Sequence, residues 1–172
     1  IHLDQYISDY IENSPDQYYP DYFINEINFF KDANYQKPND FNFEMWRKFG
    51  ENDQIITQII RTDIVSDFNR YINNNQIQIN CTIPPSKFET NPFLYGKSPT
   101  LIEYSAFHGS TKIFNFLYEK NVELTSSLWI YSIHGNSPEI IHFLEEKQIK
   151  PEDETYKECL EEAIKCHHNH LV

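Results

Sequence analysis

The sequence predicts an all-α fold made of stacked helix pairs, on three observations. Apolar residues recur at helical spacing along most of the chain. Only four of the 172 residues are glycines and Val is scarce, which argues against a sheet sandwich with many tight turns. Residues 100–124 and 126–149 both carry a His-Gly pair followed by an Ile and a Phe-Leu pair. Self-similarity at this scale is typical of repeat proteins, in which each helix pair buries its apolar face against the next pair.

Composition and charge exclude several classes of protein. Hydrophobic residues make up 40% and aromatic residues 16% of the chain, which is too much apolar material for a disordered protein. The 26 acidic side chains outnumber the 14 basic ones and give a formal net charge of -12, with no local run of Lys or Arg. Because such a chain repels a phosphate backbone, we expect no nucleic-acid partner. No segment approaches the roughly 18 consecutive apolar residues of a membrane-spanning helix, so we expect no membrane association.

Residues 1–50 are predicted to form an N-terminal helical segment that packs on the repeats. Apolar residues fall at helical spacing in residues 3–11 and again in residues 23–30, with Pro-containing breaks between them. Residues 41–50 have the composition of a short third helix that Gly50 closes.

Residues 51–172 are predicted to form the repeats. In residues 51–78, isoleucines on one face of a helix are followed by a second apolar stripe, so we expect a helix pair with its corner at Arg61-Thr62-Asp63. Residues 79–99 contain four prolines and are predicted to be a long connecting loop with one extended piece.

The next unit, residues 100–125, has clear helix signals. Thr100 and Glu103 have the spacing of a capping box, so a helix begins there. Gly109 ends this helix because glycine accepts left-handed backbone angles, and Ser110 is placed to cap the following helix. That second helix carries an apolar stripe formed by Ile113, Phe116 and Leu117.

Two further units repeat these signals. In residues 126–152 the first helix spans Leu128 to Ile133, Gly135 repeats the corner, and Ser137-Pro138-Glu139 begins a second helix. The stripe is repeated by Ile140, Phe143 and Leu144. In residues 153–172 we expect a capping box of Thr155 and Glu158, an inner face with Leu160 and Ala163, and a truncated second helix that begins at Leu171-Val172. In this register Ala106 aligns with Ser132 and with Ala163.

The units at residues 100–152 resemble ankyrin repeats, whose pattern reads Thr-Pro-Leu-His-x-Ala-Ala-x-x-Gly before a second helix with a Val/Ile pair and a Leu-Leu pair. In the first unit the matching residues are Thr100, Ile102, Ser105, Ala106, Gly109, Ile113, Phe114, Phe116 and Leu117. In the second, with one residue inserted after the corner, they are Ser126, Leu128, Ser132, Gly135, Ile140, Ile141, Phe143 and Leu144. Glu103 and Trp129 replace the His of the pattern, its Pro is absent, and the spacing is shorter than roughly 33 residues. The resemblance implies an ankyrin-like helical-repeat solenoid with short or missing β-hairpin arms.

The amino-acid sequence of residues 83–170 also resembles that of a large ankyrin-containing family of trichomonad protists, which has no assigned specific function. The resemblance implies a non-catalytic module that binds a protein partner through the concave face and needs no cofactor. In ankyrin proteins the two residues before the corner Gly lie on that face, which here implies Phe107, His108, Ile133, His134, Ile164 and Lys165. Exposed apolar residues beside histidines suit a contact surface. The alternative is that Phe107 and Ile133 pack internally, as we expect of Trp129.

The chain has three cysteines, Cys81, Cys159 and Cys166. Because their number is odd and they are widely spaced, they favour reduced thiols in a cytoplasmic protein over a set of disulfides. The alternative function is a metal-binding site or thiol enzyme centred on Cys159, Cys166, His167, His168 and His170. On one unbroken helix Cys159, Cys166 and His170 share a face and suit zinc. The repeat interpretation instead ends the helix at Cys166 to His168, which separates these ligands, so we expect no bound metal.

Overall fold

The computed structural model describes residues 45, 46 and 48–171, and this part of the chain is mostly helical. The predicted all-α class is confirmed there, while the helices expected before residue 45 lie outside the described residues. No strand is present in the described part, and residues 79–99 contain only one isolated bridge, between Thr82 and Thr100. The helices with described bounds are α4 (Ile55–Thr62), α5 (Val65–Asn74), α6 (Leu101–Phe107), α7 (Thr111–Glu119), α8 (Leu128–His134), α9 (Pro138–Glu146), α10 (Lys157–Lys165) and the 3-10 helix η1 (Asn169–Leu171).

The chain divides into two compact units, which are described separately. The described part of the first consists of residues 45–53, without residue 47, and residues 85–97. A short helical turn ends at Gly50, whose φ is 64° and whose amide donates to the carbonyl of Trp46 at 3.0 Å, as predicted. Thr90 donates both its amide and its hydroxyl to the carbonyl of Gly50, and Phe88 is buried against Trp46.

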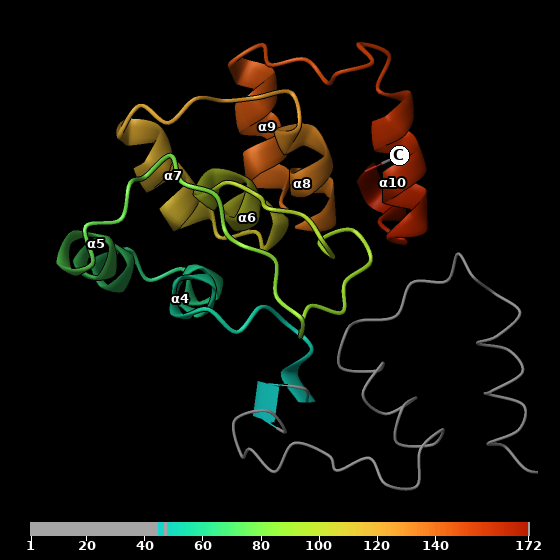
Figure 1. The fold of residues 1–172 in the computed structure, drawn as a ribbon. Helices are drawn as coiled ribbons and strands as arrows, with labels where there is room; N and C mark the ends of the chain where they lie inside the picture. Colours follow the sequence, from blue (N-terminus) through green and yellow to red (C-terminus); the bar gives the residue numbers. More distant parts are fainter. Residues whose placement is uncertain (1–44, 47, 172) are drawn as a thin grey trace, which may run out of the picture. The chain divides into compact units, whose positions relative to one another are not determined.

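The second unit, residues 54–84 and 98–171, is a double row of helices. Helices α4, α6, α8 and α10 pack side by side in chain order and form the first row (Figure 1). Helices α5, α7 and α9 form the second row, each beside its partner in the first. Edge-to-face ring pairs join the second-row helices: Phe68 with Phe116 at 5.9 Å, and Phe114 with Phe143 at 5.6 Å.

Four of the six residues of the predicted apolar stripes belong to the core between the two rows, whereas Phe116 and Phe143 are half-buried. Ile113 and Leu117 of α7 and Ile140 and Leu144 of α9 are fully buried or nearly so. Full burial of one such side chain contributes about 1.5–3 kcal/mol. Trp129 is also buried, as predicted, and its indole N–H donates to the carbonyl of Ile149 at 2.8 Å.

The backbone angles at the helix corners show that the predicted alignment of the two repeat units was wrong by one residue. Gly109 has a φ of 62°, as predicted, but Gly135 has a φ of -67°, and Asn136 takes the left-handed conformation instead, with a φ of 48°. Position 109 therefore matches position 136 and not position 135. The same register pairs Ser105 with Ser132, whose buried hydroxyls donate to the carbonyls three residues earlier at 2.8 and 2.9 Å. The predicted register, which pairs Ala106 with Ser132 and inserts a residue after the corner, was wrong because Asn also tolerates left-handed angles.

Glycine is nevertheless required at position 135, for a different reason. A Cβ atom built there overlaps the carbonyl oxygen of Ala106 in the neighbouring helix α6. A Cβ atom on Gly109 approaches the carbonyl oxygen of Gly135 to 3.0 Å. The two corner glycines thus allow close contact between backbones.

Two predicted helix caps are confirmed. Glu103 Oε2 accepts the amide of Thr100 at 2.8 Å while Thr100 Oγ1 accepts the amide of Glu103 at 3.3 Å, which completes a capping box. The hydroxyl of Ser137 accepts the amide of Ile140, with Pro138 at the first position of α9.

Two other predicted caps were wrong, because an aspartate takes each place. The hydroxyl of Ser110 donates to the carbonyl of Ile60 at 2.7 Å. The free amides of α7 are instead accepted by the carboxylate of Asp63, which lies 2.9 Å from the amide of Ile113. At α10, Asp153 accepts the amide of Glu158 that was predicted to bond Thr155, and also that of Tyr156, each at 3.2 Å. Thr155 Oγ1 accepts the amide of Lys157 instead, at 3.4 Å.

Candidate functional site

Polar and aromatic side chains form a continuous line across the C-terminal ends of the first-row helices. We call this line the corner strip. Its members come from α4, α6, α8 and α10 or from the residue that follows each helix. They are Arg61, Tyr104, Phe107, His108, His134, Glu162, Lys165 and Cys166.

Direct contacts connect the first half of the corner strip. Arg61 donates from Nη1 to the hydroxyl of Tyr104 at 2.8 Å. The ring of Tyr104 lies 4.5 Å from that of His108, centroid to centroid. Phe107 then stacks on His134 of the next helix, with centroids 5.1 Å apart and planes inclined by 30°. Helices α4, α6 and α8 are thereby linked by side chains that no local sequence pattern places together.

The second half of the corner strip is a cluster of three ionisable groups around one imidazole. Nε2 of His134 lies 2.9 Å from Oε1 of Glu162, and Nδ1 of His134 lies 3.4 Å from Sγ of Cys166. Lys165 approaches the other oxygen of Glu162 to 3.0 Å. One candidate ligand atom from each of His134, Glu162 and Cys166 lies within 4.8 Å of the other two.

Burial and neighbouring charges shift the pKa values in the corner strip. Burial, followed by the positive charge of Arg61, lowers the pKa of His108 to about 4. Burial acts to raise the pKa of Glu162, but the hydrogen bond from Lys165 and the imidazole of His134 bring it below its ordinary value. Burial and then the carboxylate of Glu162 raise the pKa of the Cys166 thiol.

This arrangement does not favour the thiol enzyme considered from the sequence. A nucleophilic cysteine requires a lowered thiol pKa and nearby donors for an oxyanion, whereas Cys166 has a raised pKa and follows the negative end of α10. The amides of residues 166, 167 and 168 donate to carbonyls within the helix end. None of these three amides is therefore directed at a substrate.

The predicted partner-contact residues divide into three environments. Phe107 is 9% exposed and Ile133 is 4% exposed, so the expectation of exposed side chains was wrong for both, and internal packing holds. His108 and His134 are largely buried within the corner strip. On α10, Ile164 is 54% exposed and the side chain of Lys165 is 67% exposed.

The cysteines and histidines of the alternative metal or thiol site near the C-terminal end are dispersed, as the repeat interpretation predicted. Helix α10 ends at Lys165 and His167 is left-handed, with a φ of 58°, so the predicted break is confirmed. Cys159 is buried on another side, where burial and then Asp153 raise its thiol pKa to about 11. Nδ1 of His168 lies 2.8 Å from the carbonyl oxygen of Ile133.

Apolar side chains also form an exposed line along α10. Tyr156, the residue before α10, and Leu160 within it are each 43% exposed and, with Ile164, follow at intervals of four residues. We call these three residues the α10 stripe. Leu160 was predicted on the inner face; it is exposed because its equivalent in α8, Trp129, is covered by α10, whereas no described helix covers α10 in the same way.

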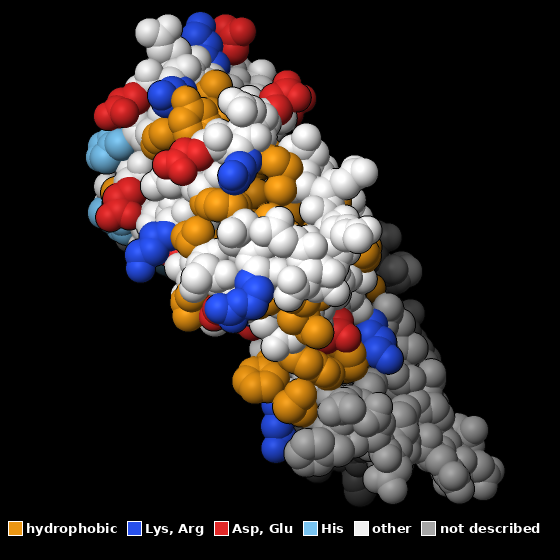
Figure 2. Space-filling view, turned by 90° about the vertical axis from the view of Figure 1, so that its left-hand side faces the viewer, with side chains coloured by type: hydrophobic (Ala, Val, Ile, Leu, Met, Phe, Trp, Pro, Cys, Tyr) orange, Lys and Arg blue, Asp and Glu red, His pale blue; other side chains and the backbone are white. Residues whose placement is uncertain are grey.

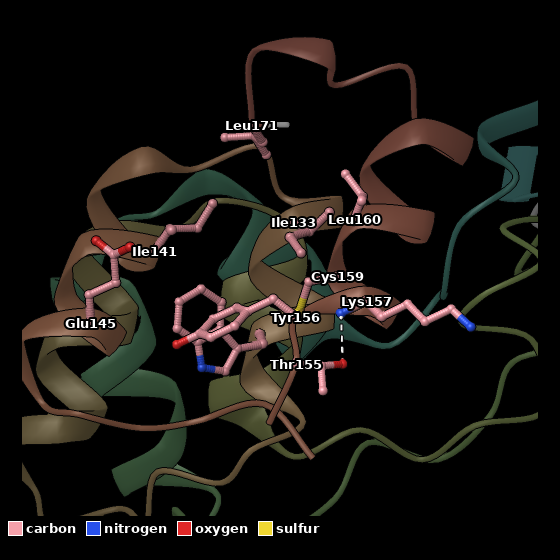
Figure 3. A pocket seen from close by; sticks show the side chains of 10 residues that line it. Ile133, Ile141, Glu145, Thr155, Tyr156, Lys157, Cys159, Leu160 and Leu171 are labelled. Carbon is pink, nitrogen blue, oxygen red and sulfur yellow. Dashed lines mark hydrogen bonds between the residues drawn. The ribbon is translucent and has the colours of Figure 1, made fainter. Parts of the chain in front are cut away.

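A pocket of about 490 Å³ lies beside the α10 stripe. Figure 3 shows Ile141 and Glu145 of α9 on one side of it, and Leu160 with Lys157 of α10 on the other. Ile133 and Cys159 line its inner part, and Leu171 of η1 lies at its edge. The combination of an open, mainly apolar pocket with exposed apolar neighbours is typical of a binding surface.

No family model, curated protein or solved structure matches this chain. None of the described helices has the length and apolar character needed to cross a membrane.

Proposed function

We propose that this chain is an ankyrin-like repeat module that binds a helical segment of a protein partner on the α10 stripe, without catalysis. The observation that carries the proposal is the exposure of Tyr156, Leu160 and Ile164 beside the pocket between α9 and α10.

The repeat interpretation is supported by equivalent local geometry. The corner residues Gly109 and Asn136 are both left-handed, and the amides of Ser110 and Ser137 both donate to the serine carbonyl five residues earlier, at 2.8 and 3.5 Å. The amides of Val122 and Ile149 likewise both donate to the leucine carbonyl five residues earlier. Both of these pairs have the same sequence separation as the two corner residues.

The binding role is supported by a comparison of α10 with α8, because the residues of α8 that match the α10 stripe are covered by another helix. With the left-handed His167 aligned on Asn136, Leu160 matches Trp129 and Ile164 matches Ile133. Trp129 and Ile133 are buried in a fold where α10 packs on α8. An amphipathic helix with apolar residues three and four apart suits the α10 stripe in the same way.

Charge favours a basic partner. The chain has a net charge of -12, and around the stripe and pocket the exposed acidic side chains of Glu145, Glu158 and Glu161 outnumber the exposed lysines 157 and 165. Lys or Arg beside the apolar residues of a partner helix complements these acids and accelerates association. On the face seen in Figure 2, Lys and Arg are interspersed with Asp, Glu and hydrophobic side chains, which does not favour a nucleic-acid phosphate backbone.

The test is a selection with a phage-displayed library of amphipathic helical peptides. We expect enriched peptides to carry an apolar stripe with an excess of Lys and Arg, and to lose at least about tenfold in affinity for Leu160→Ser and Ile164→Ser. The matched control is Ile55→Ser, because Ile55 is another exposed isoleucine, on α4. Circular dichroism verifies that each variant is folded.

Two outcomes contradict the proposal. One is enrichment of peptides that bind Ile164→Ser and Ile55→Ser equally well, which places the contact elsewhere. The other is self-association of the chain in analytical ultracentrifugation that Ile164→Ser abolishes, which makes a second copy the occupant of the stripe.

A further inference from the structure

We propose that His134, Glu162 and Cys166 together bind one divalent transition-metal ion, with zinc as the preferred ion. This site differs from the cysteine and histidine set suggested by sequence spacing and shares only Cys166 with it. It is also independent of the proposed partner binding, because no residue of the α10 stripe takes part.

The distances suit a small tetrahedral ion. In zinc sites the metal–nitrogen distance is about 2.0–2.1 Å and the metal–sulfur distance about 2.3 Å, so the nitrogen and sulfur ligands are about 3.6 Å apart. Nδ1 of His134 lies 3.4 Å from Sγ of Cys166. One ligand atom from each of His134, Glu162 and Cys166 lies within 4.8 Å of the other two. Oε1 of Glu162 lies against Nε2 of the ring, so binding through Nδ1 requires this carboxylate to turn toward Cys166.

The ligand types select the metal. Imidazole, thiolate and carboxylate together suit Zn²⁺, whereas Mg²⁺ and Ca²⁺ prefer oxygen ligands alone. Three protein ligands leave a fourth position for water. All three residues are partly buried, so the ion has fewer competing water ligands than on an open surface.

The local electrostatics favour a cation. Cys166 follows the last residue of α10, where the carbonyl groups of the helix end carry partial negative charge. Glu162 adds a carboxylate one helical turn earlier. On binding, the Cys166 thiol releases its proton to solvent as the metal–sulfur bond forms. Lys165 is the only described cation within 4.0 Å of Glu162 besides the imidazole, and its exposed side chain is able to move into solvent.

The surrounding contacts hold the imidazole in place. Phe107 stacks on the ring of His134 from α6, which restricts its rotation. His168, just after Cys166, lies 2.8 Å from the carbonyl oxygen of Ile133 and fixes the chain after α10 against α8. Because His134 comes from α8 and the other two ligands come from α10 and its C-terminal end, bound metal joins the two helices and stabilises their packing.

The first measurement is titration of the purified, reduced chain with Co²⁺, followed by displacement with Zn²⁺. We expect one equivalent to bind with a thiolate-to-cobalt charge-transfer band, and Zn²⁺ to remove the band. Cys166→Ser abolishes the band, and His134→Gln and Glu162→Gln weaken binding at least about tenfold. The matched controls Cys81→Ser and His142→Gln should keep the charge-transfer band, since neither residue belongs to the cluster.

The second measurement is thermal unfolding with and without excess Zn²⁺, which requires no spectroscopic band. The wild type is expected to gain thermal stability with Zn²⁺, and Cys166→Ala is expected to gain none. Absence of a thiolate band in the folded wild type overturns the proposal. So does a band that survives in Cys166→Ser but disappears in Cys159→Ser, because the ion is then bound at the other thiol.

Discussion

Acid sensitivity of His108 is the sharpest stability prediction from the corner strip. Its imidazole packs between Tyr104 and Phe107 and faces the guanidinium of Arg61 from α4. Burial and this positive charge lower the pKa of His108 from 6.5 to about 4. Since the folded-state pKa is lower than the unfolded one, the unfolded chain binds the proton first as the pH falls.

The magnitude follows from the two pKa values. The free energy of unfolding is insensitive to His108 above about pH 6.5, decreases as the pH falls, and loses about 3 kcal/mol in total by about pH 4. Between about pH 7.5 and about pH 5.5 the expected loss from this residue alone is about 1.3 kcal/mol.

The assay compares urea unfolding of the wild type and His108→Leu at these two pH values, followed by circular dichroism. Leucine does not titrate, and Nε2 of His108 has no hydrogen-bond partner among the described residues, so the replacement leaves no group unpaired at that atom. The pH-dependent loss should be smaller in His108→Leu by about 1.3 kcal/mol. His142→Gln, at an exposed position of α9, is the control. An equal loss in the wild type and His108→Leu refutes the reasoning.

Three further predictions concern packing and capping, each measured by urea unfolding. Gly135→Ala forces a Cβ atom onto the carbonyl oxygen of Ala106 and should cost about 3 kcal/mol, whereas Gly96→Ala, which has open space, should cost about 1 kcal/mol from its left-handed angle alone. Asp63→Ala removes the acceptor for two amides of α7 and should cost about 1–2 kcal/mol; no change means that water replaces the carboxylate. Phe107→Asp should unfold the chain, because it buries a charge, and a folded variant contradicts the observed burial.

Sequence reasoning predicted the features that depend on nearby residues. The capping box of Thr100 and Glu103 and the start of α9 at Ser137 and Pro138 are each complete within one helical turn, so their signals are local. The cap of α7 is different, because Asp63 lies far before Ile113 in the sequence and reaches it only in the folded chain. Ser110 has the right residue type for a cap, but its hydroxyl donates to the carbonyl of Ile60 instead.

Predicting the residues of the candidate site required the correct alignment of the repeat units with one another. Because that alignment was wrong by one residue, only part of the site was predicted. Aligning the glycines 109 and 135 shifted the second unit by one residue and placed Ile133 on the surface. The left-handed angles instead align Phe107 with His134 and Lys165, three members of the corner strip. The contacts of His134 with Glu162 and Cys166 join two units and arise only in the folded chain.

The link between the first two helix pairs tolerates changes in chain length. Asp63 and Ser110 hold α4 against α6 and α7 although a long loop separates α5 from α6, and these side-chain contacts do not depend on the course of that loop. Loop-closure entropy grows only slowly, by about 0.6 kcal/mol for each doubling of loop length. An insertion at the exposed junction of α5 and this loop, residues 73–76, should therefore alter stability little as long as both contacts survive. Later positions are less suitable, because Ile83, Phe88 and Leu94 are buried.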